Sequence, residues 1–566
     1  MIKASVDRGR ITLSFRYDPH LVEKCKSILG ARWNKAERFW AYPATRNAAR
    51  AVWSVFAPFP DGPANFVISQ EFHNLLTDIE LPPDGTPIPN VPTKPWEHQR
   101  KAWWYVVSQW GTNGNPCGAA LLGMDMGTGK TKVTIDLIQV YGFKRVLVTC
   151  PTKVVKVWGR EAKRHCDPRI RFLLLGKGPI TKRADRLLTA AGVPTPLVVV
   201  TNYEATRAVS SYREMHDAIK RTAWDLLVLD EIHRIKAPGG MDSRFFDSLA
   251  DMIPCRLGLT GTSLGEGPMD AYGQFRFLDR SIFGTSFVRF RGRYAIMGGF
   301  EGKKVVDYQN EGEFAERFGS ITYEVRAEDV LDLPDEHHVE REVELSEATQ
   351  KHYSEMDEEF TTWVGEDGGD VSVQNAMSRI GKLQEITGGF VRDPDTKRVH
   401  RLGSEKAEEL GDVLDDLRPD EPLLVCCRFR PDLDIVREIV EKKGRTYSEL
   451  SGKADQSEGW MDGKTDVLGV QIDAGKEGID LTRARYCVIY SMSYSRTAYA
   501  QFLRRIRRPR QKSKTVTFIH LVASGTVDKR VYRALLRKTS VVESILEEVR
   551  AEKRRSSRAR RKEEDE

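Results

Sequence analysis

The sequence predicts an α/β protein with two parallel-sheet lobes, helical insertions and a small α+β module in front. Two sets of short apolar runs support this prediction, and helically spaced stretches separate the runs within each set. The first set comprises residues 119–122, 145–149, 197–201, 226–230 and 256–260, and the second comprises 423–427, 467–472, 486–490 and 516–521. Parallel sheets bind their ligands at the C-terminal ends of the strands, so we expect the functional residues directly after these runs.

Composition is typical of a globular protein. The chain has 566 residues, of which 30% are charged, a mean hydropathy of −0.45 and a net charge of +7. No apolar run approaches the roughly 18 residues of a membrane span, and the first residues lack an apolar signal core. We therefore expect a soluble intracellular protein without a membrane partner, nuclear only in a eukaryotic host. The eight cysteines form no CxxC pair and are expected to be buried free thiols.

Residues 1–58 are predicted to form a separate module. Ile11, Leu13 and Phe15 alternate as in a strand, and residues 21–29 have helical spacing. Tryptophan and phenylalanine are interleaved with basic residues further on, at Arg32, Trp33, Lys35, Arg38, Phe39 and Trp40. These residues alone allow two interpretations: a small aromatic core under a basic rim, or a nucleic-acid platform.

Proline-rich stretches at 58–63 and 81–95 are expected to be linkers. They give a predicted division into a module (1–58), a linker (59–92), a first lobe (93–280), a helical insertion (281–400), a second lobe (401–540) and a charged tail (541–566). The basic run KRRSSRARRK in that tail is either a solvated end, a non-specific phosphate contact or a nuclear address.

The glycine-rich loop after the first apolar run predicts a phosphate site. Its glycines let several backbone N–H groups and a helix N-terminus face one anion. Lys130 would then reach the β- and γ-phosphates, and the Thr131 hydroxyl would bind Mg²⁺. The expected nucleotide contacts are Met126, Gly127, Thr128, Gly129, Lys130 and Thr131. Met124 stands where the full motif has glycine, so the loop by itself also fits a chance glycine-rich turn.

Two acids follow the strand-like run 226–230. Asp230 is placed to hold Mg²⁺, and Glu231 is placed to orient and deprotonate the attacking water. The run 256–260 is followed by LTGT (259–262), whose hydroxyls are expected to face the nucleotide.

The second lobe supplies candidate arginines. Gln501, Arg505 and Arg508 are spaced by four and three residues, which predicts one helix face. Two guanidinium groups on this face would act as arginine fingers on the γ-phosphate, although a basic phosphate-binding face fits the same spacing. Gly478 and Asp480 follow the run 467–472 and are expected near the nucleotide. The order of all these motifs along the chain favours the ATPase interpretation.

Residues 93–540 resemble the superfamily 2 helicase-like ATPases, and among them the Swi/Snf, DEAH-type DNA translocases. The resemblance rests on PWEHQ (95–99), DEIHRIK (230–236), LTGT (259–262), DVLDLP (329–334), QFLRRIRR (501–508) with Gln511, and GTVD (525–528). It implies two RecA-like lobes, the cofactors ATP and Mg²⁺, and a phosphate loop that often lacks its first glycine. It also implies that Gln99 contacts adenine and that Thr152, Lys153, Asn202, Tyr203, Arg428 and Arg430 contact the DNA backbone.

The front module resembles the HARP-type domains of annealing helicases. FRYD (15–18), ARWN (31–34) and FW (39–40) carry this resemblance. It implies that Arg32, Trp33 and Arg38 bind branched DNA. The second lobe departs from the family pattern: Lys476 and Asp480 replace glycine and asparagine, and Asp473 stands where a Ser-Thr-Lys run is usual. An acid at Asp473 would repel a phosphate, which weakens the case for DNA contact from that loop.

These observations lead us to expect a monomeric ATP-dependent DNA translocase or helicase, of the compact kind that phages and bacteria encode. We expect it to remodel forked or branched duplexes in replication, recombination or repair. Two alternatives remain open. One is an RNA helicase, and the other is a DNA-annealing or DNA-binding scaffold in which ATP acts only as a conformational latch.

Overall fold

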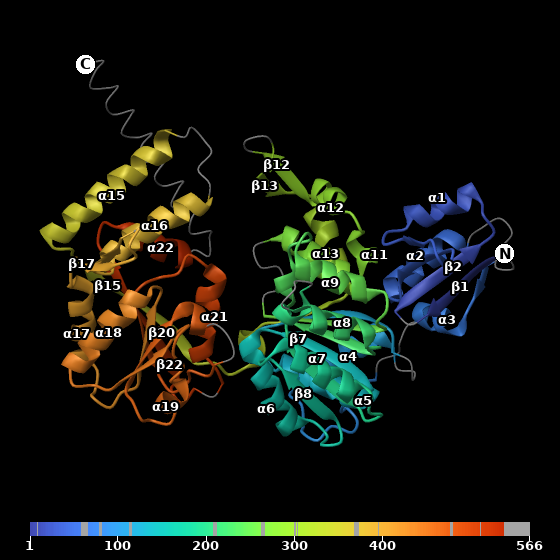
Figure 1. Ribbon diagram of the computed structural model, residues 1–566, viewed down its shortest axis with the longest axis horizontal. Coiled ribbons are helices and arrows are strands. Elements are labelled where there is room, and N and C mark those ends of the chain that lie inside the picture. Colours follow the sequence, from blue (N-terminus) through green and yellow to red (C-terminus); the bar gives the residue numbers. More distant parts are fainter. Residues whose placement is uncertain are drawn as a thin grey trace, which may run out of the picture. The chain divides into compact units, whose positions relative to one another are not determined.

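The computed structural model describes residues 1–7, 9–57, 66–77, 82–111, 116–207, 212–261, 267–298, 302, 304–366, 373–393, 395–475, 479–509 and 511–536. The chain divides into two compact units, Met1–Leu331 and Asp332–Glu566, which are taken one at a time below (Figure 1). In the described part, no helix is both long enough and apolar enough to cross a bilayer. All eight cysteines are free thiols, as expected, and only Cys166 is more than marginally exposed.

The first unit begins with an α+β module. Its five-stranded sheet has the order β3-β4-β2-β1-β5, with β1 (Ile2–Asp7), β2 (Arg10–Phe15), β3 (Arg32–Asn34), β4 (Phe39–Pro43) and β5 (Phe66–Ile68). The module's helices are α1 (Pro19–Ser27), α2 (Arg46–Phe56) and α3 (Gln70–Leu76). Strand β5 pairs with β1, and α3 contributes Phe72 and Leu75 to the module core. The module therefore extends past residue 58, into the segment expected to be a linker.

The module is attached to the lobe that follows it by buried and half-buried charges. Arg32 Nη2 donates to both carboxylate oxygens of Asp247 at 2.7 and 2.8 Å, and Arg32 Nη1 donates to Asp251 at 3.0 Å. Arg280, which is fully buried, donates to the Gly30 carbonyl at 2.8 Å and pairs with Asp251. Arg32, expected to contact DNA, thus takes part in an intramolecular interface.

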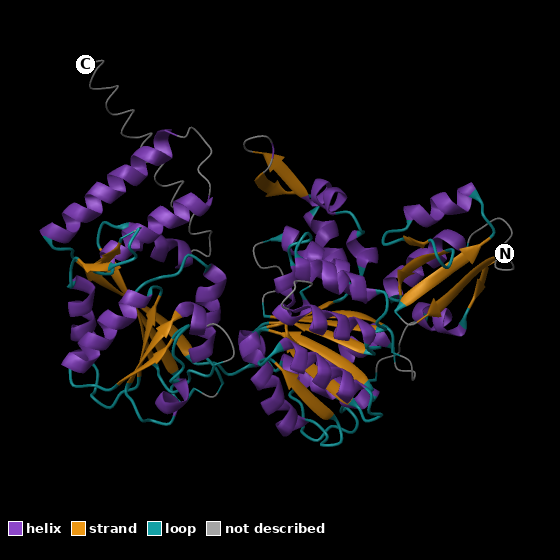
Figure 2. Ribbon diagram, viewed as in Figure 1, coloured by secondary structure: helices purple, strands orange, loops and turns teal. Residues whose placement is uncertain are grey.

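The lobe contains a seven-stranded parallel sheet of order β14-β6-β11-β10-β7-β9-β8 (Figure 2). Its strands are β6 (Gly118–Met124), β7 (Arg145–Cys150), β8 (Arg171–Leu175), β9 (Leu197–Asn202), β10 (Leu226–Asp230), β11 (Cys255–Thr260) and β14 (Thr322–Val325). Alternate side chains of each strand point to opposite faces and join two separate apolar cores.

Helices cover both faces of this sheet. One face packs against α4 (Glu97–Trp110), α5 (Lys130–Tyr141) and α6 (Val155–His165), and the other against α7 (Ile180–Ala191), α8 (Arg213–Arg221), α9 (Met241–Ala250) and α10 (Ala271–Leu278). Short 3₁₀ turns follow several strands: η2 (Thr152–Val154), η3 (Tyr203–Thr206), η5 (Ile232–Ile235) and η6 (Pro268–Asp270).

An aromatic-rich extension completes the first unit. It consists of α11 (Arg280–Phe283), α12 (Phe287–Tyr294), the hairpin β12 (Ala295–Gly298) and β13 (Lys304–Tyr308), α13 (Glu311–Gly319) and α14 (Ala327–Val330). Rings from three of these helices pack on one another; the Phe283 and Phe314 ring centroids are 5.3 Å apart.

The second unit contains a six-stranded parallel sheet of order β15-β22-β21-β18-β20-β19. Its strands are β15 (Asp335–Val343), β18 (Leu423–Cys427), β19 (Tyr447–Leu450), β20 (Val467–Gln471), β21 (Tyr486–Ile489) and β22 (Thr515–Ala523). Around it lie α15 (Glu347–Glu366), α16 (Val373–Thr387), α17 (Glu405–Asp416), α18 (Arg430–Lys442), α19 (Ser457–Met461), α20 (Ile472–Gly475), α21 (Arg496–Ile506) and α22 (Val527–Leu536), with a small hairpin of β16 (Phe390–Arg392) and β17 (Val399–Arg401).

The predicted fold class, with two parallel-sheet lobes, is confirmed. The expected insertion at 281–400 is not one element, because β14 joins the first sheet and β15 joins the second. The division between the units falls at residue 331. The expected tail at 541–566 lies outside the described residues.

Candidate functional site

The glycine-rich loop connects the end of β6 to the start of α5, as the sequence predicts. Gly127 and Gly129 adopt positive φ angles of 85° and 90°, which lets the backbone turn sharply into the helix. The Lys130 ammonium donates to the carbonyls of Met124 at 2.6 Å and Asp125 at 3.2 Å, and the Thr128 hydroxyl donates to Asp125 at 2.7 Å. Hydrogen bonds within the loop therefore hold its conformation, and the Lys130 side chain takes part in them.

Gln99 on α4 supports this loop from the side. Its amide nitrogen donates to the Thr128 carbonyl at 3.0 Å, and its amide oxygen accepts from the Trp96 N–H at 3.0 Å. His98 Nε2 lies 2.8 Å from the same Thr128 carbonyl. A Cβ on Gly129 would clash with the Gln99 amide, so a larger residue there would have to displace that side chain and would also strain the φ angle. Gln99 and the phosphate loop therefore form one packed assembly.

Asp230 ends β10 and is buried, with 6% of its surface exposed. Its Oδ2 accepts a hydrogen bond from the Trp158 indole at 2.9 Å. Burial, and next the charge of Glu231, raises the pKa of Asp230 to about 6, while the Trp158 hydrogen bond and Lys130 oppose that rise. Asp230 thus lies close enough to Lys130 for the charge of the lysine to act on its carboxylate.

Glu231 has an uncommon backbone conformation. Its φ and ψ are 58° and 54°, in the left-handed region that costs a residue with a side chain about 1–2 kcal/mol. Its Oε2 lies 3.3 Å from His233 Nδ1, and its side chain is 16% exposed. Glu231 therefore lies in a tight turn directly after the strand, whereas Asp230 is the last residue of the strand.

The LTGT segment also reaches the loop. Thr260 ends β11 and is fully buried, and a Cβ placed on Gly261 would lie 3.8 Å from the Lys130 ammonium. Thr262 lies outside the described residues. The ends of three neighbouring strands, β6, β11 and β10, therefore bring the loop, Gly261 and the two acids together.

Thr131 and Asp230 provide the ligand types that suit Mg²⁺. Thr131 is half-buried in the first turn of α5 and offers a hydroxyl oxygen, and Asp230 offers a carboxylate. Mg²⁺ prefers such oxygen ligands together with substrate phosphates. The residues present fit the ion that the sequence predicts.

The expected DNA contacts of the first unit differ in accessibility. Lys153 is exposed and Thr152 half-buried in η2, after β7. Asn202 is nearly buried: its amide oxygen accepts from Arg183 at 2.5 Å and its nitrogen donates to Glu204 at 2.6 Å. Tyr203 is fully buried, so the expected DNA contact through its side chain is corrected: the hydroxyl donates to the Asp230 carbonyl at 2.9 Å.

In the front module, Trp33 and Arg38 are accessible. Trp33 is 51% exposed and packs on Trp40 with ring centroids 5.4 Å apart. Arg38 is exposed and has a φ of 56° in the turn between β3 and β4. Both interpretations of the aromatic cluster thus retain support, since Trp40 belongs to the core and Trp33 does not.

The second unit holds Gln501 and Arg505 on α21, four residues apart and hence on one face. Arg508 does not share this helix, because α21 ends at Ile506 and Pro509 disfavours helical geometry in the residue before it. The expected three-residue face is corrected to two. Asp480 accepts from the Thr482 N–H and hydroxyl at 3.1 and 2.7 Å. Gly478 lies outside the described residues.

Arg428 and Arg430 follow β18. The Arg428 guanidinium lies 3.4 Å from the Tyr494 ring centroid and donates to Gln384 at 2.6 Å. Arg430 is exposed at the first turn of α18. Of the two expected DNA contacts, Arg428 is held by its neighbours, whereas Arg430 is accessible.

Several residues of this site have no local signal in the sequence. Trp158 reaches Asp230 from α6, 72 positions away, and Tyr203 reaches it from η3. His98 could have been suspected only from its position beside Gln99.

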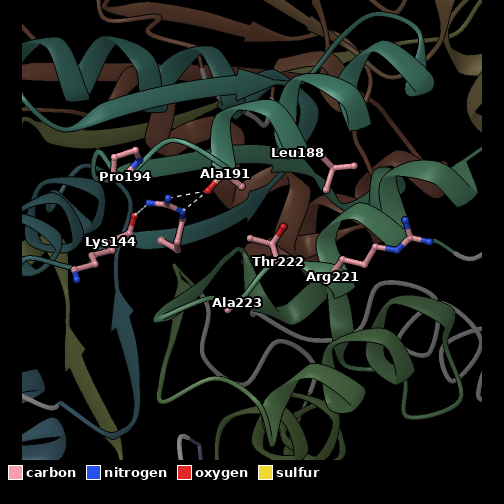
Figure 3. A pocket seen from close by; sticks show the side chains of 8 residues that line it. Lys144, Leu188, Ala191, Pro194, Arg221, Thr222 and Ala223 are labelled. Carbon is pink, nitrogen blue, oxygen red and sulfur yellow. Dashed lines mark hydrogen bonds between the residues drawn. The ribbon is translucent and has the colours of Figure 1, made fainter.

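A hollow of about 480 Å³ at the opposite edge of the sheet contains none of the candidates (Figure 3). There Arg145 is occupied by backbone carbonyls, including that of Ala191 at 2.8 Å.

Comparison with known proteins agrees with this geometry. The SNF2-related domain matches residues 98–388 and the helicase conserved C-terminal domain matches residues 405–510. The chain belongs to the SNF2-related family and is a helicase-like ATPase.

Three relatives illustrate the range of the family. Chromodomain-helicase-DNA-binding protein 1-like of Danio rerio is 23% identical, over 76% of this chain and 42% of its own length. DNA repair and recombination protein RDH54 of Saccharomyces cerevisiae strain S288c is 23% identical, over 77% of this chain and 50% of its own. Putative protein p41 of Acyrthosiphon pisum secondary endosymbiont phage 1 is 23% identical, over 75% of this chain and 93% of its own. The chain thus spans half or less of the two eukaryotic relatives.

A solved structure, the Sulfolobus solfataricus SWI2/SNF2 ATPase core in complex with dsDNA, is also similar. It is 17% identical, with 82% of this chain and 95% of that chain covered and a TM-score of 0.37.

Proposed function

We propose that this protein is an ATP-driven translocase or helicase that moves on duplex DNA and remodels forked or branched substrates. The main observation is the meeting of Lys130, Gly261 and Asp230 at the ends of three neighbouring strands. Family membership supports ATP hydrolysis, and the names of the relatives support DNA as the partner. The HARP-like pattern of the front module supports branched DNA. A role in replication, recombination or repair is part of this proposal.

The first unit would bind ATP and start hydrolysis. Backbone N–H groups of the loop and the Lys130 ammonium would hold the phosphates, and Gln99 would contact the base. Thr131 and Asp230 would hold Mg²⁺, which neutralises phosphate charge when bound. The Glu231 carboxylate would accept a proton from the attacking water.

The second unit would contribute Arg505 and Arg508 as donors to the charge that develops on the γ-phosphate. Such arginines are worth roughly 10³–10⁵ in rate. Gln501, Asp480 and Gly478 would complete the nucleotide contacts. DNA contacts would come from Thr152, Lys153, Asn202 and Arg430, with Trp33 and Arg38 in the module. Contacts to phosphates make binding independent of sequence and sensitive to salt.

Turnover of ATP with and without DNA tests the proposal. Lys130→Ala should abolish DNA-stimulated hydrolysis, and Glu231→Gln should abolish hydrolysis while ATP still binds. Lys144→Ala is a matched control, because Lys144 is exposed at the opposite edge of the same sheet. Normal DNA-stimulated turnover in either site variant would contradict the assigned roles.

The choice of nucleic acid separates the alternatives. Stimulation by duplex DNA above single-stranded DNA and RNA would support translocation on duplexes, whereas stimulation by RNA alone would indicate an RNA helicase. DNA annealing without any DNA-stimulated turnover would indicate the scaffold. Triplex displacement and strand separation, measured on forked and blunt duplexes, would show whether branched substrates are preferred.

A further inference from the structure

The turn that carries Glu231 is held by a side chain outside the catalytic motif. The Tyr203 hydroxyl donates to the Asp230 carbonyl at 2.9 Å and lies 3.5 Å from the Glu231 carbonyl. Burial keeps the pKa of Tyr203 well above its usual value, so the hydroxyl keeps its proton and donates. The two carbonyls flank the left-handed residue, whose conformation needs external support.

The residue next to Tyr203 contacts the loops after β7 and β9. The Glu204 carboxylate accepts from the Asn202 amide at 2.6 Å and from the Thr152 hydroxyl at 3.4 Å. The pKa of Glu204 is lowered overall, which favours its ionised form. Burial raises this pKa, but hydrogen bonds from the backbone and Asn202, together with the charge of Arg234, have the larger, opposite effect. Glu204 thus joins the loops after β7 and β9, the two loops for which we propose DNA contact.

Arg234 connects these two residues to the far side of the catalytic turn. Its guanidinium lies 5.5 Å from the Tyr203 ring centroid, and its Nη1 lies 3.5 Å from Glu204 Oε1. Its backbone N–H donates to the Glu231 carbonyl at 3.0 Å. A shift of the loop after β7 or of the loop after β9 would therefore change the position of Glu231 through this series of contacts.

We infer that Tyr203 and Glu204 are positioning residues that couple DNA contact at the Thr152 and Asn202 loops to the orientation of Glu231. This inference rests on the proposed function. Tyr203 holds the turn that orients the Glu231 carboxylate. Glu204 contacts both loops and Arg234, so a movement of the loops on DNA binding changes the conformation of that turn. Coupling between two sites in proteins commonly amounts to about 5- to 150-fold.

Tyr203→Phe removes the hydroxyl and keeps the ring. We expect kcat for ATP to fall about tenfold or more, with KM for ATP and the affinity for duplex DNA within about twofold of wild type. Tyr141→Phe is the matched control, because the Tyr141 hydroxyl also donates to a backbone carbonyl of this lobe, that of Gly111 at 2.7 Å. A kcat for Tyr203→Phe equal to that of the control would overturn the assignment of Tyr203.

Glu204→Gln tests the coupling itself. We expect the ratio of DNA-stimulated to basal turnover to fall about fivefold or more while DNA is still bound. An unchanged ratio would overturn the role of Glu204. A fall that disappears when DNA is raised to saturation would overturn it too, because that fall would reflect only weaker DNA binding. Wild-type protein is measured in parallel. Absence of DNA stimulation in wild type would contradict the proposed function, whereas normal stimulation in wild type and both variants would contradict only this inference.

Discussion

Removing the Arg32 guanidinium should loosen the front module from the first lobe. Arg32 Nη2 donates to both carboxylate oxygens of Asp247, and the two side chains are 33% and 19% exposed. Exposed ion pairs contribute about 0.2–1 kcal/mol and hydrogen bonds to charged groups about 1.5–3 kcal/mol. This half-buried pair lies between these two cases, so we expect a coupling free energy of roughly 1–2 kcal/mol, a factor of about 5–30.

Hydrogen exchange on the full chain measures this effect. In Arg32→Ala, amides of β3 and β4 should exchange about 5- to 30-fold faster, because local opening no longer breaks the Arg32–Asp247 pair. Asp247→Ala and the double variant complete a mutant cycle. Arg10→Ala is the matched control, since Arg10 pairs with Asp7 and Glu37 inside the module and not with the lobe. Additive effects of the Arg32 and Asp247 changes would refute the reasoning and return Arg32 to the set of available DNA contacts.

Three further outcomes are expected. Gly129→Ala should weaken ATP binding far more than Gly127→Ala, because only the first introduces a clash with Gln99, although both glycines have positive φ; equal affinities would contradict the packed loop. Asp432→Asn should flatten the pH dependence of stability. Burial raises the pKa of Asp432 to about 6, so the folded state retains a proton that the unfolded state releases, and stability falls as pH rises from about 4 to about 6. Denaturation midpoints across that range would show the same fall in the variant if this assignment were wrong. Arg505→Ala and Arg508→Ala should each lower kcat and spare ATP binding, measured with a fluorescent nucleotide. A parallel loss of binding and turnover would instead indicate misfolding.

The central strands were predictable from the sequence, and the edge strands were not. All nine expected runs form strands, and they occupy the inner positions of both sheets. The four strands that the sequence pattern did not reveal, β8, β14, β15 and β19, are the four edges. An inner strand is buried on both faces and reads as an apolar run, whereas an edge strand such as β15 (DEHHVEREV) carries charge toward solvent.

The sequence also showed which residues end each inner strand. A parallel sheet places all those strand ends at one edge, so these residues were expected to lie together. The sequence therefore predicted the loop around Lys130 and the pair Asp230 and Glu231. The spacing of four and three residues took no account of Pro509, which disfavours helical geometry at Arg508 and so separates it from Arg505. The sequence could not tell a buried tyrosine from an exposed one, as Tyr203 demonstrates. Burial and partner choice depend on chain segments far apart in sequence: Trp158 approaches Asp230, and Arg32 pairs with Asp247, only because the packed layers bring them together.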